Sequence, residues 1–421
     1  MNKYNTKPLL QTTYEREFTR DTESSRLTTS SNLVADSNPK LAYKLSPEIT
    51  LDNEPTVSVV IASYNHGLYV AEALQSVLDQ TYQNFEIIVT DDGSTDNSVE
   101  VIKKFNDPRI KLFEFKENQG ACAATNNSIN NSKGKYIAIM NSDDVWALDK
   151  LEKQINFLEQ NKNIDAVFSS VEFLDENMKE FSTENRPYFF EIFKQPNRSS
   201  GEWLATFFFQ GNCLCHPSIL IKKQCYNILG LYDNRFRQLP DFDMWIKFCK
   251  NFNLYVLAEN LVKFRLLNNH KNASSPTTQN QIRGRNEHHL IMQSFFAGIK
   301  LETFKEGFYK HLKNKSCQSE IEYEIEKAFL YLKTAHSIIG IEKLYNFLEQ
   351  DNYRNILDKL YNFNDKTFQT VSASSNAFGV QDINSLISTL FFKIRHYPKI
   401  KLFKILTIRT LLYIKSKLTI N

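Results

Sequence analysis

The segment VSVVIA at residues 57–62 decides the fold class, because an unbroken β-branched run is typical of a strand buried on both faces of a sheet. A helical apolar pattern follows at 69–78, and a second strand-like segment, FEIIVT, occupies 85–90. Further elements are predicted at 98–105 (helix), 110–115 (strand), 121–131 (helix) and 136–140 (strand). This alternation predicts an α/β fold with a mostly parallel sheet flanked by helices on both faces.

Acidic pairs follow two of these strands. Asp91 and Asp92 come directly after the second strand, and Asp143 and Asp144 follow the strand at 136–140. Either pair could cap the next helix, but ligands of such sheets bind beyond the carboxyl ends of the strands. Two pairs at neighbouring strand ends would repel each other unless a cation or a donor-rich ligand lay between them. Oxygen ligands favour Mg²⁺ or Mn²⁺, which usually bind together with substrate phosphates.

Composition and cysteine usage restrict the class of protein. The chain has 421 residues, 51 Lys+Arg against 48 Asp+Glu, and a net charge of +3. A length of this order suggests two or three folded units at roughly 100–200 residues each, and the near balance of charge argues against a nucleic-acid-binding protein. The six cysteines form no CxxC pair, so reduced thiols in a cytoplasmic protein are expected. Neither a secretory signal nor a transmembrane helix is predicted.

Several nucleotide-binding and hydrolase motifs are missing, including GxGxxG after the first strand, GxxxxGK[ST] and GxSxG. Other motifs occur in a fixed order: VSVVIASYN (57–65), QTYQNFEIIVTDDGSTD (80–96), NQG (118–120), GKYIA (134–138) and SDD (142–144). This ordered set resembles family 2 glycosyltransferases with the GT-A (Rossmann-like) fold, over roughly residues 55–275.

The resemblance implies an inverting, metal-dependent transfer of a sugar from a nucleotide-sugar, expected to be a UDP-sugar, to an acceptor hydroxyl. The acceptor would be a glycan or a lipid-linked precursor in the synthesis of a surface glycan such as capsule or O-antigen. Carried over by position, Ala62 and Tyr64 would line the base pocket, and Asp92 would bind the base or ribose. Asp143 would hold the ribose or sugar, and Asp144 would ligate Mn²⁺ or Mg²⁺.

The segment QLPDFDMW at 238–245 resembles the acidic motif of the same family, which precedes a helix with a Trp. There a carboxylate acts as general base, because an alcohol is a poor nucleophile until its proton is removed. Asp241 matches that carboxylate, with Asp243 as the alternative. On a purely structural interpretation, Pro240 and Asp241 would only begin the helix.

Three more residues are assigned by the resemblance, and one position departs from it. His216 lies in the loop expected to face sugar and acceptor, although a buried structural histidine would fit nearly as well. Arg265 and His270 lie in the segment expected to close over the diphosphate, where His270 could also contact the metal or simply lie in a surface loop. Many relatives carry an acidic residue where this chain has Asn141, which lowers the negative charge available to a metal.

Three regions are expected along the chain: a flexible polar tail at 1–53, the GT-A domain at 54–280, and a helical region at 281–421. Within the GT-A domain, strands are predicted at 166–171 and 256–258, in a stretch of less regular pattern. Residues 390–421 contain basic and apolar but no acidic residues. That composition suits a helix lying on an anionic membrane, which would place the enzyme peripherally at the inner face of the cytoplasmic membrane, or a helix packed on the protein itself.

Two other functions are alternatives to the glycosyltransferase. A nucleotidyltransferase normally has a Gly-rich basic loop after the first strand, where this chain has SYNHG at 63–67. A non-catalytic sugar-binding protein of the same fold would have a broken acidic set, whereas Asp92, Asp144 and Asp241 are all present. Both observations favour an active glycosyltransferase.

Overall fold

The computed structural model describes residues 54–374, except 183–185, 187–188, 269–271, 273 and 276. The predicted tail at 1–53, His270 and the basic segment at 390–421 therefore lie outside the described residues. Within the described part, none of the helices combines the length and the apolar character needed to cross a membrane.

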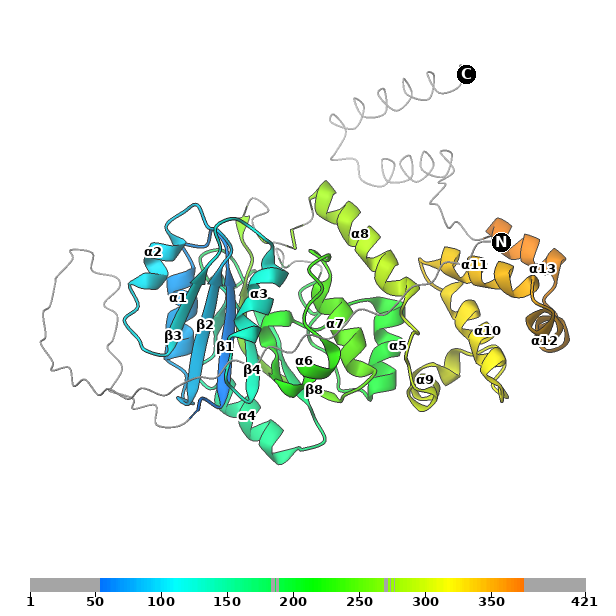
Figure 1. Ribbon diagram of the computed structural model, residues 1–421, viewed down its shortest axis with the longest axis horizontal. Helices are drawn as coiled ribbons and strands as arrows, with labels where there is room; N and C mark the ends of the chain where they lie inside the picture. The colour runs from blue at the N-terminus through cyan, green and yellow to red at the C-terminus, as the bar shows by residue number, and fades with distance from the viewer. Residues whose placement is uncertain are drawn as a thin grey trace, which may run out of the picture. The chain divides into compact units, whose positions relative to one another are not determined.

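An eight-stranded sheet forms the centre of the fold, in the order β3-β2-β1-β4-β7-β6-β8-β5 (Figure 1). Its strands are β1 (Val57–Ser63), β2 (Phe85–Asp91), β3 (Ile110–Glu114), β4 (Tyr136–Asn141), β5 (Val145–Trp146), β6 (Ala166–Leu174), β7 (Leu220–Lys222) and β8 (Leu254–Arg265). The first four strands in this order are parallel to one another, β7 is antiparallel to β4 and β6, and β5 is antiparallel to β8. Because β6 and β8 are parallel, the sheet is mixed but mostly parallel, and the predicted fold class is confirmed.

The helices connect and cover the strands. They are α1 (Val70–Leu78), α2 (Ser98–Lys103), α3 (Ala121–Asn130), α4 (Lys150–Gln160), α5 (Ser200–Gln210), α6 (Gln224–Leu229), α7 (Pro240–Cys249), α8 (Thr278–Gln293), α9 (Leu301–Phe308), α10 (Glu320–Tyr331), α11 (Ser337–Leu348), α12 (Asp351–Tyr361) and α13 (Asp365–Ser374). From α8 onward the described chain is helical, apart from short connections and a 3₁₀ turn. A helical region was predicted to begin near residue 280.

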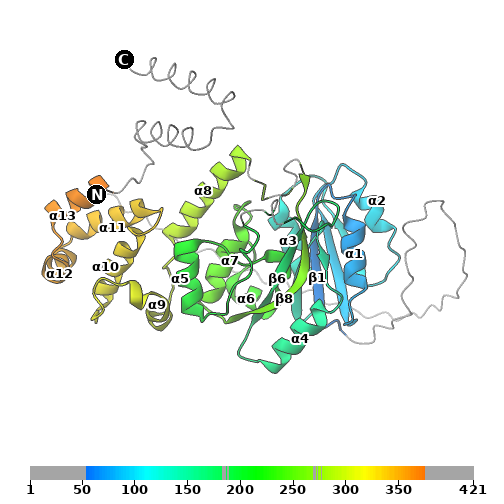
Figure 2. The same cartoon turned by 180° about the vertical axis from the view of Figure 1, so that it is seen from behind.

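The two sides of the sheet pack against separate hydrophobic cores, because successive side chains of a strand point to opposite sides. Val57, Val59 and Ile61 of β1 pack in the core with α1, whereas Val60 packs in the core with α3, α5 and α7. Figures 1 and 2 show α3 and α1 on these opposite faces. Burial on both faces explains why β1 and β2 read as continuous apolar runs in the sequence.

The core on the α3 side continues past residue 280 into the C-terminal helices. Phe208 of α5 contacts the rings of four aromatic residues that follow residue 280, at centroid distances between 4.9 and 5.6 Å: Phe295, Phe296, Phe308 and Tyr331. Buried aromatic rings dominate the energetics of such cores. The helices α8–α10 are therefore held to the sheet domain by this aromatic cluster, which we call the Phe208 cluster.

Lys150, at the start of α4, is fully buried. Its ammonium donates to Gln154 Oε1 at 2.7 Å and lies 4.0 Å from the centre of the Trp146 ring. No carboxylate forms an ion pair with it among residues 54–374 as described, and burial lowers the pKa of its ammonium to about 7. The ring face and the amide thus only partly offset the cost of burying the cation.

Candidate active site

The carboxyl ends of β1, β2 and β4 lie at one edge of the sheet, since the three strands are parallel and adjacent. The register pairs Ala62 with Asn141, and the amide of Asp92 donates to the carbonyl of Ser63 at 2.8 Å. This edge of the sheet therefore holds Ala62 and Asp92, two of the residues predicted to bind the nucleotide-sugar. Ala62 is half-buried, whereas Tyr64 is 41% exposed directly beyond β1. An exposed ring at this place is available to stack on a nucleobase.

The loops beyond these strands are tied to one another. Asn65 has a left-handed backbone (φ 54°), and its Oδ1 accepts from the amide of Thr95 at 2.8 Å. His66 Nδ1 lies 2.7 Å from the hydroxyl of Ser142. The loops after β1, β2 and β4 are thereby fixed relative to one another around Tyr64.

The two carboxylates of the Asp91–Asp92 pair have different partners. Asp91 accepts from both the amide and the hydroxyl of Ser94, at 2.8 and 2.7 Å, and so closes its own turn. Asp92 accepts from the amides of Gln119 and Gly120 at 2.6 and 2.9 Å, at the start of α3. Burial raises the pKa of Asp92, and these two amide bonds oppose the rise. Asp92 thus joins β2 to α3 at the edge where it is predicted to contact the donor.

Asp143 and Asp144 form a buried acidic pair just beyond β4. Asp144 accepts from the amide of Arg265 and from Asn141 Nδ2, both at 2.9 Å, and Asp143 accepts from Asn272 Nδ2 at 3.2 Å. Burial raises the pKa of both carboxyls, and the neighbouring Asp143 raises that of Asp144 further. Two side-by-side carboxylates with raised pKa values are the arrangement that a divalent cation relieves.

Arg265, the last residue of β8, supports this acidic pair through hydrogen bonds. Its guanidinium donates to the carbonyls of Asp143 and Glu176, each at 2.8 Å, pairs with the Glu72 carboxylate, and lies over the Tyr69 ring. These bonds lie within the protein, so the structure places Arg265 as a support of the acidic pair. Its contact with the diphosphate stays a prediction.

Asp241 lies in the first turn of α7, where Pro240 begins the helix without needing a backbone donor. Its Oδ2 accepts from Asn212 Nδ2 at 2.7 Å, and its Oδ1 accepts from the amide of Phe242 at 2.8 Å. Burial raises the pKa of this carboxyl to about 6, although the two hydrogen bonds oppose the rise. A carboxylate of this pKa is ionised at neutral pH and is a stronger base than an exposed aspartate.

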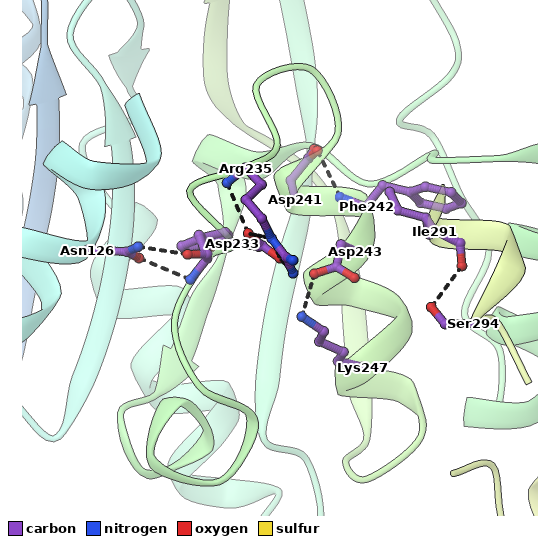
Figure 3. Close-up of polar contacts among 10 residues, drawn as sticks. Asn126, Asp233, Arg235, Asp241, Phe242, Asp243, Lys247, Ile291 and Ser294 are labelled. Atoms are coloured by element: carbon purple, nitrogen blue, oxygen red, sulfur yellow. Dashed lines mark hydrogen bonds and ion pairs between the residues drawn. The ribbon is translucent and has the colours of Figure 1, made fainter. Parts of the chain in front are cut away.

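The alternative base, Asp243, has a different environment. Its Oδ2 pairs with the ammonium of Lys247 one turn along α7, at 2.5 Å. Figure 3 shows the Asp241 and Asp243 side chains pointing in different directions from the helix, with Asp243 directed toward Lys247. The loop before α7 is fixed by α3, because the side-chain amide of Asn126 bonds to the main chain of Tyr232 in both directions, at 2.7 and 3.0 Å.

The loop before β7 contains Cys215 and His216. The Cys215 thiol interacts electrostatically with both Asp144 and Asp241. The next residue, His216, lies 2.9 Å from the Tyr232 hydroxyl and 5.9 Å from the Trp245 ring centre, and burial lowers its pKa to about 4. His216 is therefore a neutral imidazole within an aromatic setting, and its contact with substrate stays a prediction.

Known proteins carry the same sequence pattern. A family model of glycosyl transferase family 2 matches residues 58–222. The glycosyltransferase MJ1057 of Methanocaldococcus jannaschii is 35% identical over 224 residues, which are 51% of this chain and 72% of that protein. The chain belongs to glycosyl transferase family 2. A second family relative, the glycosyltransferase EpsE of Bacillus subtilis, is 31% identical over 51% of this chain and 74% of its own length.

Solved structures resemble this glycosyltransferase at low identity. S. aureus TarS (residues 1–349), crystallised in complex with UDP-GlcNAc, is 15% identical, with a TM-score of 0.48 over 73% of this chain and 92% of that one.

Three residues at this edge had not been singled out from the sequence. Asn212 holds Asp241, Asn272 holds Asp143, and Glu287 of α8 accepts from the main chain just before α7. Asn212 precedes His216 in the same loop, but its residue type carries no special signal. Glu287 lies in a polar helix and bonds to amides 48 to 50 positions away, a contact that only the tertiary structure reveals.

Proposed function

We propose that the chain is an inverting glycosyltransferase that transfers a sugar from a UDP-sugar to an acceptor hydroxyl, with Asp241 as general base. The observation that supports the proposal is the Asp241 carboxylate in the first turn of α7: burial raises its pKa to about 6, and one of its oxygens accepts a hydrogen bond from Asn212. Asp241 would take the hydroxyl proton while the acceptor oxygen bonds to the anomeric carbon and the nucleoside diphosphate leaves.

The donor is proposed to bind along the ends of β1, β2 and β4. Tyr64 would stack on the base, Asp92 would contact the base or ribose, and Asp143 the ribose or sugar. The exposure of Tyr64 and the burial of both carboxylates support this arrangement. His216 and Arg265 would contribute from the loop before β7 and from the end of β8.

Mn²⁺ or Mg²⁺ is proposed to bind at Asp144, with His270 as a further ligand. Mg²⁺ is typically held by one or two carboxylates together with substrate phosphates. Among the described residues there is no group of three or more His, Cys, Asp or Glu side chains placed to hold a metal. The raised pKa values of the acidic pair fit an ion that arrives with the diphosphate. When bound, such an ion neutralises charge on the leaving group.

The acceptor is proposed to be a lipid-linked or polymeric precursor of a surface glycan, modified in the cytoplasm. All six cysteines are unpaired and buried, as expected for that compartment. The segment at 390–421 is proposed to hold the enzyme at an anionic membrane surface. Residues 281–421 are proposed as a helical region appended to the catalytic domain at 54–280.

Substitution of Asp241 tests the proposal. Asp241→Asn keeps the shape but removes the basicity, so transfer should fall by about 10²–10⁴-fold while donor binding survives. Donors are first selected by thermal shift with UDP-, GDP-, dTDP- and CMP-sugars, with and without Mn²⁺, since a bound donor stabilises the fold. The wild type should lose activity as pH falls through about 6, because the base is then protonated.

Asp243→Asn is the matched control, since it changes an aspartate in the same turn that pairs with Lys247. It should leave turnover and its pH dependence unchanged. Loss of turnover in Asp243→Asn together with full activity in Asp241→Asn would transfer the role of base to Asp243.

A further inference from the structure

We propose that Glu287 of α8 is a positioning residue that holds the entrance of α7 and thereby aims Asp241 at the acceptor. This inference rests on the proposed role of Asp241 as base. Nothing in the sequence motifs points to Glu287, which lies in the helix after the segment expected to close over the donor.

The first observation is a set of three hydrogen bonds. The Glu287 carboxylate accepts from the amides of Arg237 (2.9 Å), Gln238 (2.8 Å) and Leu239 (2.9 Å). These are the three residues directly before Pro240, and Leu239 is the cap of α7. Glu287 is 5% exposed, so water cannot easily replace it as the acceptor. One buried carboxylate therefore fixes the main chain that leads into the first turn of α7.

The second observation is a ring stack beside the first. His288 packs flat against Phe242, with a centroid distance of 5.4 Å and an interplanar angle of 2°. Phe242 directly follows Asp241, so α8 contacts the chain on both sides of the base. His288 Nδ1 in turn contacts His336 Nε2, at the cap of α11. Glu287 and His288, two consecutive residues of α8, thus connect the start of α7 to the C-terminal helices.

Electrostatics gives Glu287 a second effect on the base. Within the described part of the chain, the titratable groups that interact with Asp241 include Cys122 on α3, Cys215 and Tyr232 on the neighbouring loops, and Glu287 on α8. Burial raises the pKa of Cys122 to about 12 and raises those of Cys215 and Tyr232 as well, so these groups are neutral at neutral pH. Asp243 and Lys247 on α7 itself form a pair. Among these groups, Glu287 is a carboxylate whose charge favours the protonated form of Asp241, in addition to the larger effect of burial.

Position and charge can be separated with two variants. Glu287→Gln replaces an acceptor oxygen with a donor and removes the charge, so kcat should fall roughly 10- to 100-fold, and the acid limb of the pH profile should move to lower pH. Glu287→Asp keeps the charge but withdraws the carboxylate, so kcat should fall while the acid limb stays in place. Donor KM should be unchanged in both variants. The assay is UDP release from UDP-glucose, UDP-galactose or UDP-N-acetylglucosamine with water as acceptor.

Glu326→Gln is the control, because Glu326 is a buried glutamate of α10 that accepts from the amides of Lys313 and Asn314 at 2.8 and 2.6 Å. It should lower Tm but leave kcat and the acid limb unchanged. If Glu287→Gln behaves in the same way, Glu287 has only a structural role and the inference is overturned. If Glu287→Gln does not fold, an unchanged kcat in Glu287→Asp overturns it. Full turnover of Asp241→Asn in parallel would instead overturn the proposed function.

Discussion

At the scale of single residues, the acidic pair beyond β4 combines burial with repulsion. Asp144 is 1% exposed and has Asp143 as its chain neighbour, yet both its oxygens also hold the surrounding chain, through Arg265 and Asn141. Asn141, at the position where many relatives carry an acidic residue, donates to Asp144. The amide therefore supports the Asp144 carboxylate instead of adding a third charge.

Asp144→Ala should abolish detectable turnover, by a factor of at least about 10²–10³, because it removes the proposed metal anchor. EDTA should have the same effect on the wild type, and added Mn²⁺ should restore activity. Circular dichroism should show that the variant remains folded. Full activity in EDTA would remove the metal from the mechanism and leave the diphosphate charge to basic side chains and helix N-termini.

The sequence indicated the residue types of the site but not their supports. Asp92, Asp144 and Asp241 could be located because each follows a recognisable strand or begins a helix. Asn272 and Glu287 could not, since their partners lie 129 and about 50 positions away. The contact of Arg265 with the diphosphate stays a prediction, and its bonds within the protein could not be foreseen because they depend on Tyr69, Glu72 and β8 meeting in space.

At the scale of elements, β1 to β4 and their helices were predicted to within one or two residues, because the buried parallel strands β1, β2 and β4 are mostly apolar and alternate with helical patterns. β8 was predicted only at 256–258 but spans Leu254–Arg265. Its middle, from Ala258 to Asn260, is exposed, and the register with β6 shifts near Ser170. An irregular, half-exposed strand of this kind gives no clear periodic pattern.

Asn126→Ala tests the contact between α3 and the loop before α7. The change leaves the amide and carbonyl of Tyr232 without their partner in a buried place, which should cost about 1–3 kcal/mol of unfolding free energy. Asn131→Ala, at the exposed end of the same helix, should change it by less than about 0.5 kcal/mol. Both values come from urea denaturation, and equal values for the two variants would contradict the contact.

At the scale of the whole molecule, the Phe208 cluster joins the sheet domain to the helices after residue 280. Phe208→Ala should lower the unfolding free energy by about 3–5 kcal/mol, because it opens a cavity in a fully packed aromatic core. Ile228→Ala is the control, since that side chain is 66% exposed and should matter by less than about 0.5 kcal/mol. A small effect of Phe208→Ala in guanidinium denaturation would mean that the helices contribute little to the core.

The buried amine of Lys150 couples folding to the release of a proton above about pH 7. Its pKa is about 7 in the native state and about 10.4 in an unfolded chain, so the unfolded chain binds more protons between these values. The unfolding free energy should therefore rise with pH across this window, by up to about 1.4 kcal/mol per pH unit. Lys150→Met, which has no proton to bind, should lack this part of the rise. Parallel stability curves for the two proteins between pH 7 and 9 would show that the ammonium keeps its charge inside the fold.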